Sequence, residues 1–396
     1  RSFTVVYEEP IGSFASEPTP GSALKRIRAA KARGEFTSVT MPLYIDLSTG
    51  EEEVWLTDGS LTNGQAPGGA VLDASNSPGF IRINGRGRKL RLTGTGTGDA
   101  VITVKNGVTL YLRNITLAGI GNNTAPLIAV DGGTLILENG VVVENNTNSA
   151  DSSGGGIVVS NNGTLRLTGA TAVIRNNVAN TTASYVGSGG VFLSGGTMLM
   201  EAGTISGNTS PGYGGGVYNK GGSLTMTGGT ISGNSGGVAL YPGSFTMTGG
   251  EISGNIAPFN GGGVYSRGTF TMKGGKITGN TAGSGSGGGS GGGVYNRLAE
   301  FTMEGGEISG NTVIGANAYS GRGGGVFFDT GTFIKKGGII ATSSGHVVYL
   351  QNNAKQRYTN AGESVNLYAH RNGDYDPWFH VDPSSGGVGD TTANWE

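Results

Sequence analysis

The side chains best suited to chemistry lie together near the C-terminal end of this 396-residue chain, interleaved with aromatic residues: Asp374, Asp376, His380 and Asp382. Asp-x-Asp and His-x-Asp spacings suit a metal ion or an acid–base pair. The same residues suit a terminal cap, with aspartates in turns around Pro377 and Pro383. We favour the cap, keep the four residues as candidate metal ligands, and expect no cofactor.

Charged residues in the middle of the chain recur at matching positions of a repeat. Two such series alternate in sign: Glu251, Lys276 and Glu307, and Lys273, Glu304 and Lys335. Acids that face a base in the next repeat stay ionised, so they are unsuited to donating a proton. A polysaccharide lyase would need clustered acids for Ca²⁺ beside an Arg or Lys base, and the repeats hold no such cluster. A non-enzymatic protein is therefore favoured over an enzyme.

These charges belong to a repeat of roughly 20–35 residues, the period typical of solenoids. Residues 261–280 form one copy, and others cover residues 214–234, 236–255 and 291–311. Each copy holds three short apolar runs separated by Gly, Asn or Ser, too short and too rich in glycine for helices. The 79 glycines follow no three-residue period, which excludes collagen. The repeat predicts an all-β fold, a right-handed single-stranded parallel β-helix of about ten rungs.

Side chains alternate along a strand, which separates internal columns from external ones. The sequence predicts three internal columns, one for each strand of a repeat. The first has the markers Leu127, Ile157, Val191, Val217, Val238, Val264, Val294 and Val326. The second contains Met200, Met226, Met247, Met272 and Met303, and the third contains Ile174, Ile205, Ile231, Ile252, Ile277 and Ile308. An asparagine stands three residues after most of these isoleucines, and we expect a stacked ladder at a turn: Asn208, Asn234, Asn255, Asn280 and Asn311.

The residue after each marker is expected to face outward, in a mostly aromatic column: Phe192, Tyr218, Ala239, Tyr265, Tyr295 and Phe327. Exposed aromatic residues would contact a partner or stack on sugar rings. They would also stack on one another along the sheet. The outer positions of the second strand carry Ser and Thr between residues 223 and 302. This array resembles the ice-contacting face of β-helical antifreeze proteins, although Leu199 and Glu300 interrupt it.

We divide the chain into four segments: an extended segment over 1–20, a helical cap with an irregular first coil over 21–70, the β-helix over 71–350, and a C-terminal cap over 351–396. The helix is expected at residues 22–33, which Ser22 can cap and Gly34 can end. In the first segment Phe3, Val5 and Tyr7 alternate as in a strand. We expect this strand to join copies end to end by strand addition.

Composition narrows the function further. The formal net charge of −1 gives no global attraction for nucleic acid. The chain has no cysteine, hence no disulfide or thiolate chemistry, and no apolar run long enough for a transmembrane helix. Because the first residue is Arg1, we expect a processed or trimmed chain.

The motifs Gly-Gly-Val at residues 262–264 and Ile-Thr-Gly-Asn at residues 277–280 are typical of the repeat. They resemble bacterial surface β-helix proteins, particularly the Gly-Gly-Ala-Ile and Phe-x-x-Asn repeats of polymorphic outer-membrane proteins and related adhesins. The resemblance covers about residues 125–345. It implies a secreted or cell-surface protein with an adhesive role.

We therefore expect a surface adhesin, or a filament or matrix subunit that self-associates end to end, with a carbohydrate or host-surface ligand. The alternatives are a polysaccharide-binding or polysaccharide-degrading protein, as a lyase or glycoside hydrolase, and an ice-binding protein.

Overall fold

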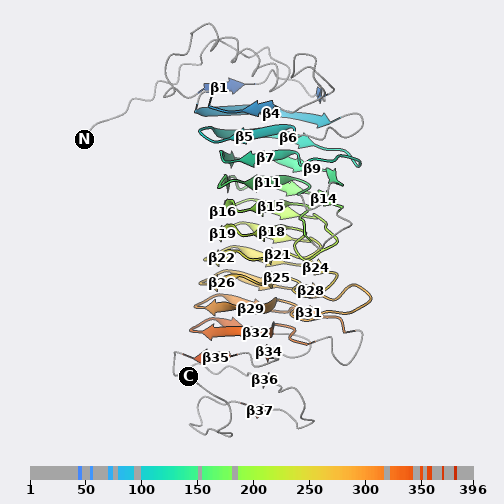
Figure 1. Cartoon of the computed structure of the whole chain (residues 1–396), viewed down its shortest axis with the longest axis vertical. Coiled ribbons are helices and arrows are strands. Elements are labelled where there is room, and N and C mark those ends of the chain that lie inside the picture. Colours follow the sequence, from blue (N-terminus) through green and yellow to red (C-terminus); the bar gives the residue numbers. More distant parts are fainter. Residues whose placement is uncertain are drawn as a thin grey trace, which may run out of the picture.

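The structure is a computed structural model that describes residues 70–74, 79–92, 100–149, 154–180, 186–315 and 322–341, and short strands between 43 and 56 and between 348 and 380. These residues form an all-β parallel solenoid, and they contain no helix. The strands lie one above another along the long axis of the molecule (Figure 1). The helix expected at residues 22–33 lies outside the described residues, and the expected number of rungs depends on ends that are only partly described.

Each turn has three strands, and each strand pairs in parallel with its equivalents in neighbouring turns. The first column contains β3 (Ala70–Leu72), β5 (Ile102–Lys105), β7 (Ile128–Asp131), β11 (Ile157–Ser160), β15 (Val191–Ser194), β18 (Val217–Lys220), β21 (Val238–Leu240), β25 (Val264–Ser266), the first parts of β29 (Val294–Met303) and β32 (Val326–Lys335), and β34 (Val348–Leu350).

The second column contains β1 (Leu43–Asp46), the first parts of β4 (Phe80–Leu92) and β6 (Thr109–Ala118), β8 (Thr134–Leu137), β12 (Thr164–Leu167), β16 (Thr197–Met200), β19 (Ser223–Met226), β22 (Ser244–Met247), β26 (Thr269–Met272), the last parts of β29 and β32, and β35 (Lys355–Tyr358).

The third column contains β2 (Val54–Leu56), the last parts of β4 and β6, β9 (Val142–Glu144), β13 (Val173–Arg175), β17 (Thr204–Ser206), β20 (Thr230–Ser232), β23 (Glu251–Ser253), β27 (Lys276–Thr278), β30 (Glu307–Ser309) and β33 (Ile339–Ile340).

Short strands also pair along the edge that carries the longer loops. They are β10 (Thr147–Asn148) with β14 (Val178–Ala179), and β24 (Ile256–Ala257) with β28 (Thr281–Ala282) and β31 (Thr312–Val313). The strands β14, β24, β28 and β31 all lie on one side of the stack (Figure 1). Near the C-terminal end, β36 (Tyr368–Ala369) pairs antiparallel with β37 (Phe379–His380).

The predicted internal columns are confirmed, apart from two positions at which the prediction was wrong by one residue. The marker, methionine and isoleucine columns are buried in one continuous core. Ile128, and not Leu127, pairs with Ile157, so the marker in that turn is one residue later than expected. Lys335 pairs with Met303 and occupies the methionine column, where it is 3% exposed and donates to the carbonyl of Gly338 at 2.8 Å. The next residue, Lys336, therefore occupies the place beside Glu304 that was expected for Lys335.

Glycines permit this close stacking at two positions of the repeat. Gly275 has a φ of 83°, in the left-handed region, and a Cβ there would lie 2.6 Å from Cε of Met247 in the preceding turn. A Cβ on Gly263 would lie 2.6 Å from the carbonyl oxygen of Gly293 in the next turn. Neither position accepts a side chain, because the adjacent turn already fills the space.

The expected asparagine ladder is confirmed, and it satisfies its own buried polar groups. Asn255 is fully buried, and its Oδ1 accepts hydrogen bonds from the backbone N–H and Nδ2 of Asn234, at 3.0 and 2.9 Å. Its Nδ2 donates to the carbonyl of Ile231 and to Oδ1 of Asn280, both at 2.9 Å. The ladder runs further upstream than the sequence analysis placed it, through Asn146, Asn177, Asn208, Asn234, Asn255, Asn280 and Asn311.

We predict that Asn255→Ala lowers the free energy of unfolding by about 2–4 kcal/mol, because the backbone N–H and one Nδ2 hydrogen of Asn234 lose their acceptor and the carbonyl of Ile231 loses its side-chain donor. Denaturant titration followed by circular dichroism measures the change. The control is Ser253→Ala, at a half-buried position two residues earlier, for which we expect less than about 0.5 kcal/mol. Equal effects of the two substitutions would contradict the prediction.

Candidate functional site

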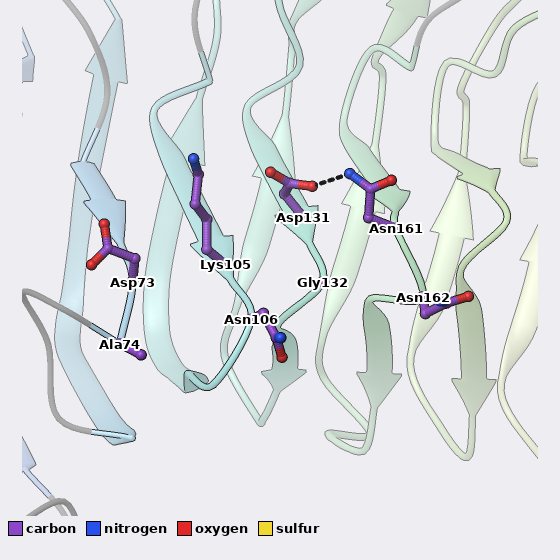
Figure 2. A pocket seen from close by; sticks show the side chains of 8 residues that line it. All are labelled: Asp73, Ala74, Lys105, Asn106, Asp131, Gly132, Asn161 and Asn162. Atoms are coloured by element: carbon purple, nitrogen blue, oxygen red, sulfur yellow. Dashed lines mark hydrogen bonds between the residues drawn. The ribbon is translucent and has the colours of Figure 1, made fainter.

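A shallow, open cavity of about 700 Å³ lies where the first-column strands end, towards the N-terminal end of the stack. It is lined by Asp73, Ala74, Lys105, Asn106, Asp131, Gly132, Asn161 and Asn162 (Figure 2). These residues follow or end β3, β5, β7 and β11. The chain turns sharply there, and Gly132, Asn161 and Asn162 take positive φ values of 80°, 52° and 61°, a conformation that Gly and Asn tolerate best.

Charges alternate along this cavity. Lys105 pairs in register with Asp131, and Asp73 follows Leu72, which pairs with Val104. Figure 2 shows the three charged side chains on successive turns, followed by Asn161, whose Nδ2 donates to Oδ1 of Asp131 at 2.5 Å. The backbones of the two acids lie two turns apart, about 10 Å, with the lysine between them. The cavity can thus bind a small polar molecule, but it does not bring two carboxylates side by side.

The sequence analysis did not single out these cavity residues. The signal that would have found them is their shared position, since each charge comes at the end of a first-column strand. Among the described residues, His, Asp and Glu side chains form no group of three or more that could hold a metal ion.

The aromatic column forms a stacked ladder outside the main core. Its rings make a separate cluster with centroid distances of 5.6 Å between Phe192 and Tyr218, 5.3 Å between Tyr265 and Tyr295, and 5.1 Å between Tyr295 and Phe327. The expectation that these side chains are exposed is wrong, since none exceeds 7%. Stacking on one another, the second possibility, is what the structure contains.

The gap that Ala239 leaves in the ladder is filled from a neighbouring loop. The ring of Tyr213 stacks on Tyr265 with centroids 4.0 Å apart, and Phe259 packs against Tyr213 at 5.8 Å. These loops also explain the burial, because they cover a column that points away from the main core. The ring faces of Tyr265 are therefore used within the protein, and what remains for a ligand is the hydroxyl edge. Contact with a partner or a carbohydrate stays a prediction for this column.

Burial changes the acid–base behaviour of the ladder. It raises the pKa of Tyr265 to about 12, and the neighbouring Tyr213 adds to the increase, while Arg267 and Arg297 oppose it. Burial likewise raises the pKa of Tyr218 and of Tyr295 above the ordinary value of 10.0. The folded protein thus favours the neutral phenols more strongly than the unfolded chain does.

We predict that Tyr265→Phe reduces the loss of stability in alkali. Because the pKa is raised on folding, the contribution of Tyr265 is complete below about pH 10 and is lost as the pH rises towards about 12. The variant lacks this ionisation, so its unfolding midpoint should fall less than that of the wild type between pH 9 and pH 11. Parallel slopes for the two proteins would contradict the prediction.

Ion pairs connect outward positions of adjacent turns, as expected. Lys276 lies 3.7 Å from Glu307, and Lys273 lies 3.6 Å from Glu304. The other cation beside Glu304 is Lys336, at 3.2 Å, in place of the expected Lys335. These pairs are exposed enough for each to contribute little stability.

Glu144 is a more deeply buried acid that the sequence analysis did not single out. It is 4% exposed and lies 3.0 Å from Nζ of Lys89 and 2.7 Å from Nη2 of Arg175. Burial alone would raise the pKa of Glu144, but the hydrogen bonds and charges of the two cations outweigh it, so the pKa lies below its ordinary value. Glu144 is held as an anion and is unsuited to donate protons. Its direct pairing with Arg175 in register was the available signal.

We predict that Glu144→Gln destabilises the protein by about 1–2 kcal/mol at pH 7, because it leaves two cations without their shared anion. The lowered pKa means that this contribution is present above about pH 4.5 and lost in more acidic solution. The difference from wild type should therefore shrink at pH 3, measured by denaturant titration. Glu201→Gln, which breaks the more exposed pair with Arg166, is the control and should cost less than about 0.5 kcal/mol.

Two groups of predicted site residues lie outside the described part of the chain. Phe3, Val5 and Tyr7 are in the first group, and Asp374, Asp376 and Asp382 are in the second. For His380 the structure describes the strand β37 but not the side chain. Strand addition and the tail metal site therefore stay predictions.

The outer Ser and Thr positions of the second column are aligned as expected. Thr225, Thr246, Thr271 and Thr302 pair in register on consecutive turns. Thr302 is 6% exposed and donates to Glu300 at 3.1 Å, so the array ends at that turn. Whether the array binds ice stays an open prediction.

No family model, curated protein or solved structure matches this chain. The resemblance to adhesin repeats thus depends on the repeat residues themselves. In the described part of the chain no helix has the length and apolar character needed to cross a membrane.

Proposed function

We propose that this protein is a non-enzymatic, right-handed β-helix that is secreted or displayed on a cell surface. It acts there as an adhesin or as a subunit of a filament or matrix. The observation that carries the proposal is that several outward acids of the solenoid pair with cations from other turns. They are Glu138, Glu144, Glu201, Glu304 and Glu307.

This pairing argues against hydrolysis or elimination by a side-chain acid. A general acid works best with a pKa near the working pH, which burial or a second carboxylate would provide. The pKa values of Glu144 and Glu304 are instead lowered, in both cases by cations from other turns. The charged residues at repeated positions therefore hold the turns together. This arrangement best supports a function as an elongated scaffold.

A rod of parallel turns also has two different ends. A contact between unlike ends does not close on itself, so it propagates into a filament. In this proposal the strand containing Phe3, Val5 and Tyr7 docks on the next copy by strand addition. A polysaccharide-degrading enzyme remains the alternative and would require a carboxylate pair in a groove.

The test of self-assembly is particle size and shape for the full chain, by light scattering and electron microscopy. We expect rods that join end to end, and shorter assemblies after Val5→Asp with Tyr7→Asp. The matched control is Thr4→Asp with Val6→Asp, which adds the same charge on the other face of the same strand. Monomers at every concentration, or equal effects of the two double variants, would contradict end-to-end joining.

The test of the non-enzymatic assignment is incubation with acidic and neutral polysaccharides, followed by measurement of chain length. We expect no shortening at any pH between 4 and 9. Shortened chains would contradict the assignment, and Glu→Gln variants would then locate the acid.

A further inference from the structure

A row of basic residues lies on the outer face of the first strand column. We define the basic strip as Lys220, Tyr241, Arg267 and Arg297. Lys220 ends β18, and the next three residues follow β21, β25 and the pair Tyr295–Asn296 of β29. Backbone hydrogen bonds place them on consecutive turns: Tyr241 N–H donates to Asn219 at 2.8 Å, and Arg267 N–H donates to Leu240 at 2.9 Å.

The strip differs from the other charged columns because two of its three cations form no ion pair with a described acid. In the described part of the chain, neither Lys220 nor Arg267 forms an ion pair. Arg267 instead lies over the ring of Tyr241, 4.5 Å from its centroid. Arg297 has an acid, Asp329, at 3.1 Å, at the C-terminal end of the strip. Like charges on adjacent strands are destabilising, so stacking alone does not account for this arrangement.

The tyrosine ladder lies beside the strip, two residues earlier in each strand. Tyr218 precedes Lys220, Tyr265 precedes Arg267, and Tyr295 precedes Arg297. The rings are buried against one another, and the charge of Arg267 acts on the phenols of both Tyr218 and Tyr265. This face therefore combines an ammonium group, guanidinium groups and the exposed phenol of Tyr241, all of which can donate hydrogen bonds.

We propose that the basic strip binds an acidic polysaccharide that lies parallel to the rod axis, with carboxylate or sulfate groups against successive turns. Arg267 and Arg297 lie on adjacent turns, about 4.8 Å apart, and Lys220 lies two turns from Arg267, about 10 Å, which suits a linear polymer with anions spaced along it. The proposal rests on the function proposed above and names the ligand class of a surface adhesin.

The same features disfavour nucleic acid as the ligand. Proteins that bind it strongly neutralise on the order of six to ten phosphates, whereas the strip has three cations on a chain of net charge −1. Single strands also stack their bases on exposed aromatic faces. Here Arg267 covers one face of Tyr241, and the ladder rings stack on each other.

The experiment measures binding of the full chain to heparin, a sulfated probe, and to polygalacturonate, a carboxylated probe. Neutral dextran and a single-stranded oligonucleotide serve as comparisons. We expect binding to at least one acidic polysaccharide, weakened by salt. Lys220→Gln with Arg267→Gln should reduce this affinity by about tenfold or more, because two charge-assisted contacts are lost. Which probe binds more tightly distinguishes sulfate from carboxylate.

The matched control is Lys273→Gln with Lys276→Gln, which changes the net charge equally in the same turn as Arg267 but outside the first strand column. It should change affinity by less than about twofold, because both lysines lie outside the strip and already pair with Glu304 and Glu307. Unfolding midpoints of both double variants verify folding. Equal losses for the two variants, no binding of either acidic probe, or tighter binding of the oligonucleotide would overturn the proposal. Shortening of the polysaccharide would overturn the non-enzymatic function and leave the strip as a binding site.

Discussion

The contact between one turn and the next is the interaction on which the whole molecule depends. Parallel strands meet at about 4.8 Å, so each side chain faces the equivalent side chain of the next repeat. A position of the repeat tolerates a residue type whose side chain packs well on the equivalent side chain of the next turn, whether that residue is the same or different. Asparagine meets this demand fully, because the Oδ1 and Nδ2 of Asn255 serve the turns on both sides. A buried polar ladder is thereby satisfied without water.

The requirement that equivalent side chains pack on one another also accounts for the other positions of the repeat. Methionine packs under a glycine of the next turn, as Met247 does under Gly275, and so the two residues recur together. Aromatic rings stack face to face, and charges pair with opposite charges across turns. A surface built this way leaves few groups free for catalysis. The ion pairs between turns are incomplete at the basic strip around Arg267, and for this reason we propose a ligand there.

The columns of the repeat could be predicted because periodicity carries them directly. The internal positions and the asparagine ladder both followed from alternation and spacing. Errors arose where the repeat is irregular. Lys335 pairs with Met303, and β32 pairs with β29 at the same offset there as at Val294 and Val326, so this lysine stands where the repeat has methionine. A one-residue shift exchanges inside and outside in a strand.

The sequence by itself determined the solenoid, since a repeat with three short strands can bury its apolar residues only by stacking on its copies. It could not determine what covers the outer face of a strand. The aromatic column does point away from the main core, but Tyr213 and Phe259 reach over it from loops whose paths no periodic pattern specifies. How the side chains of different turns and loops lie relative to one another decides three features. These are the burial of Tyr265, the two cations beside Glu144, and the lack of an ion pair between Arg267 and any described acid. These are properties of the tertiary structure alone.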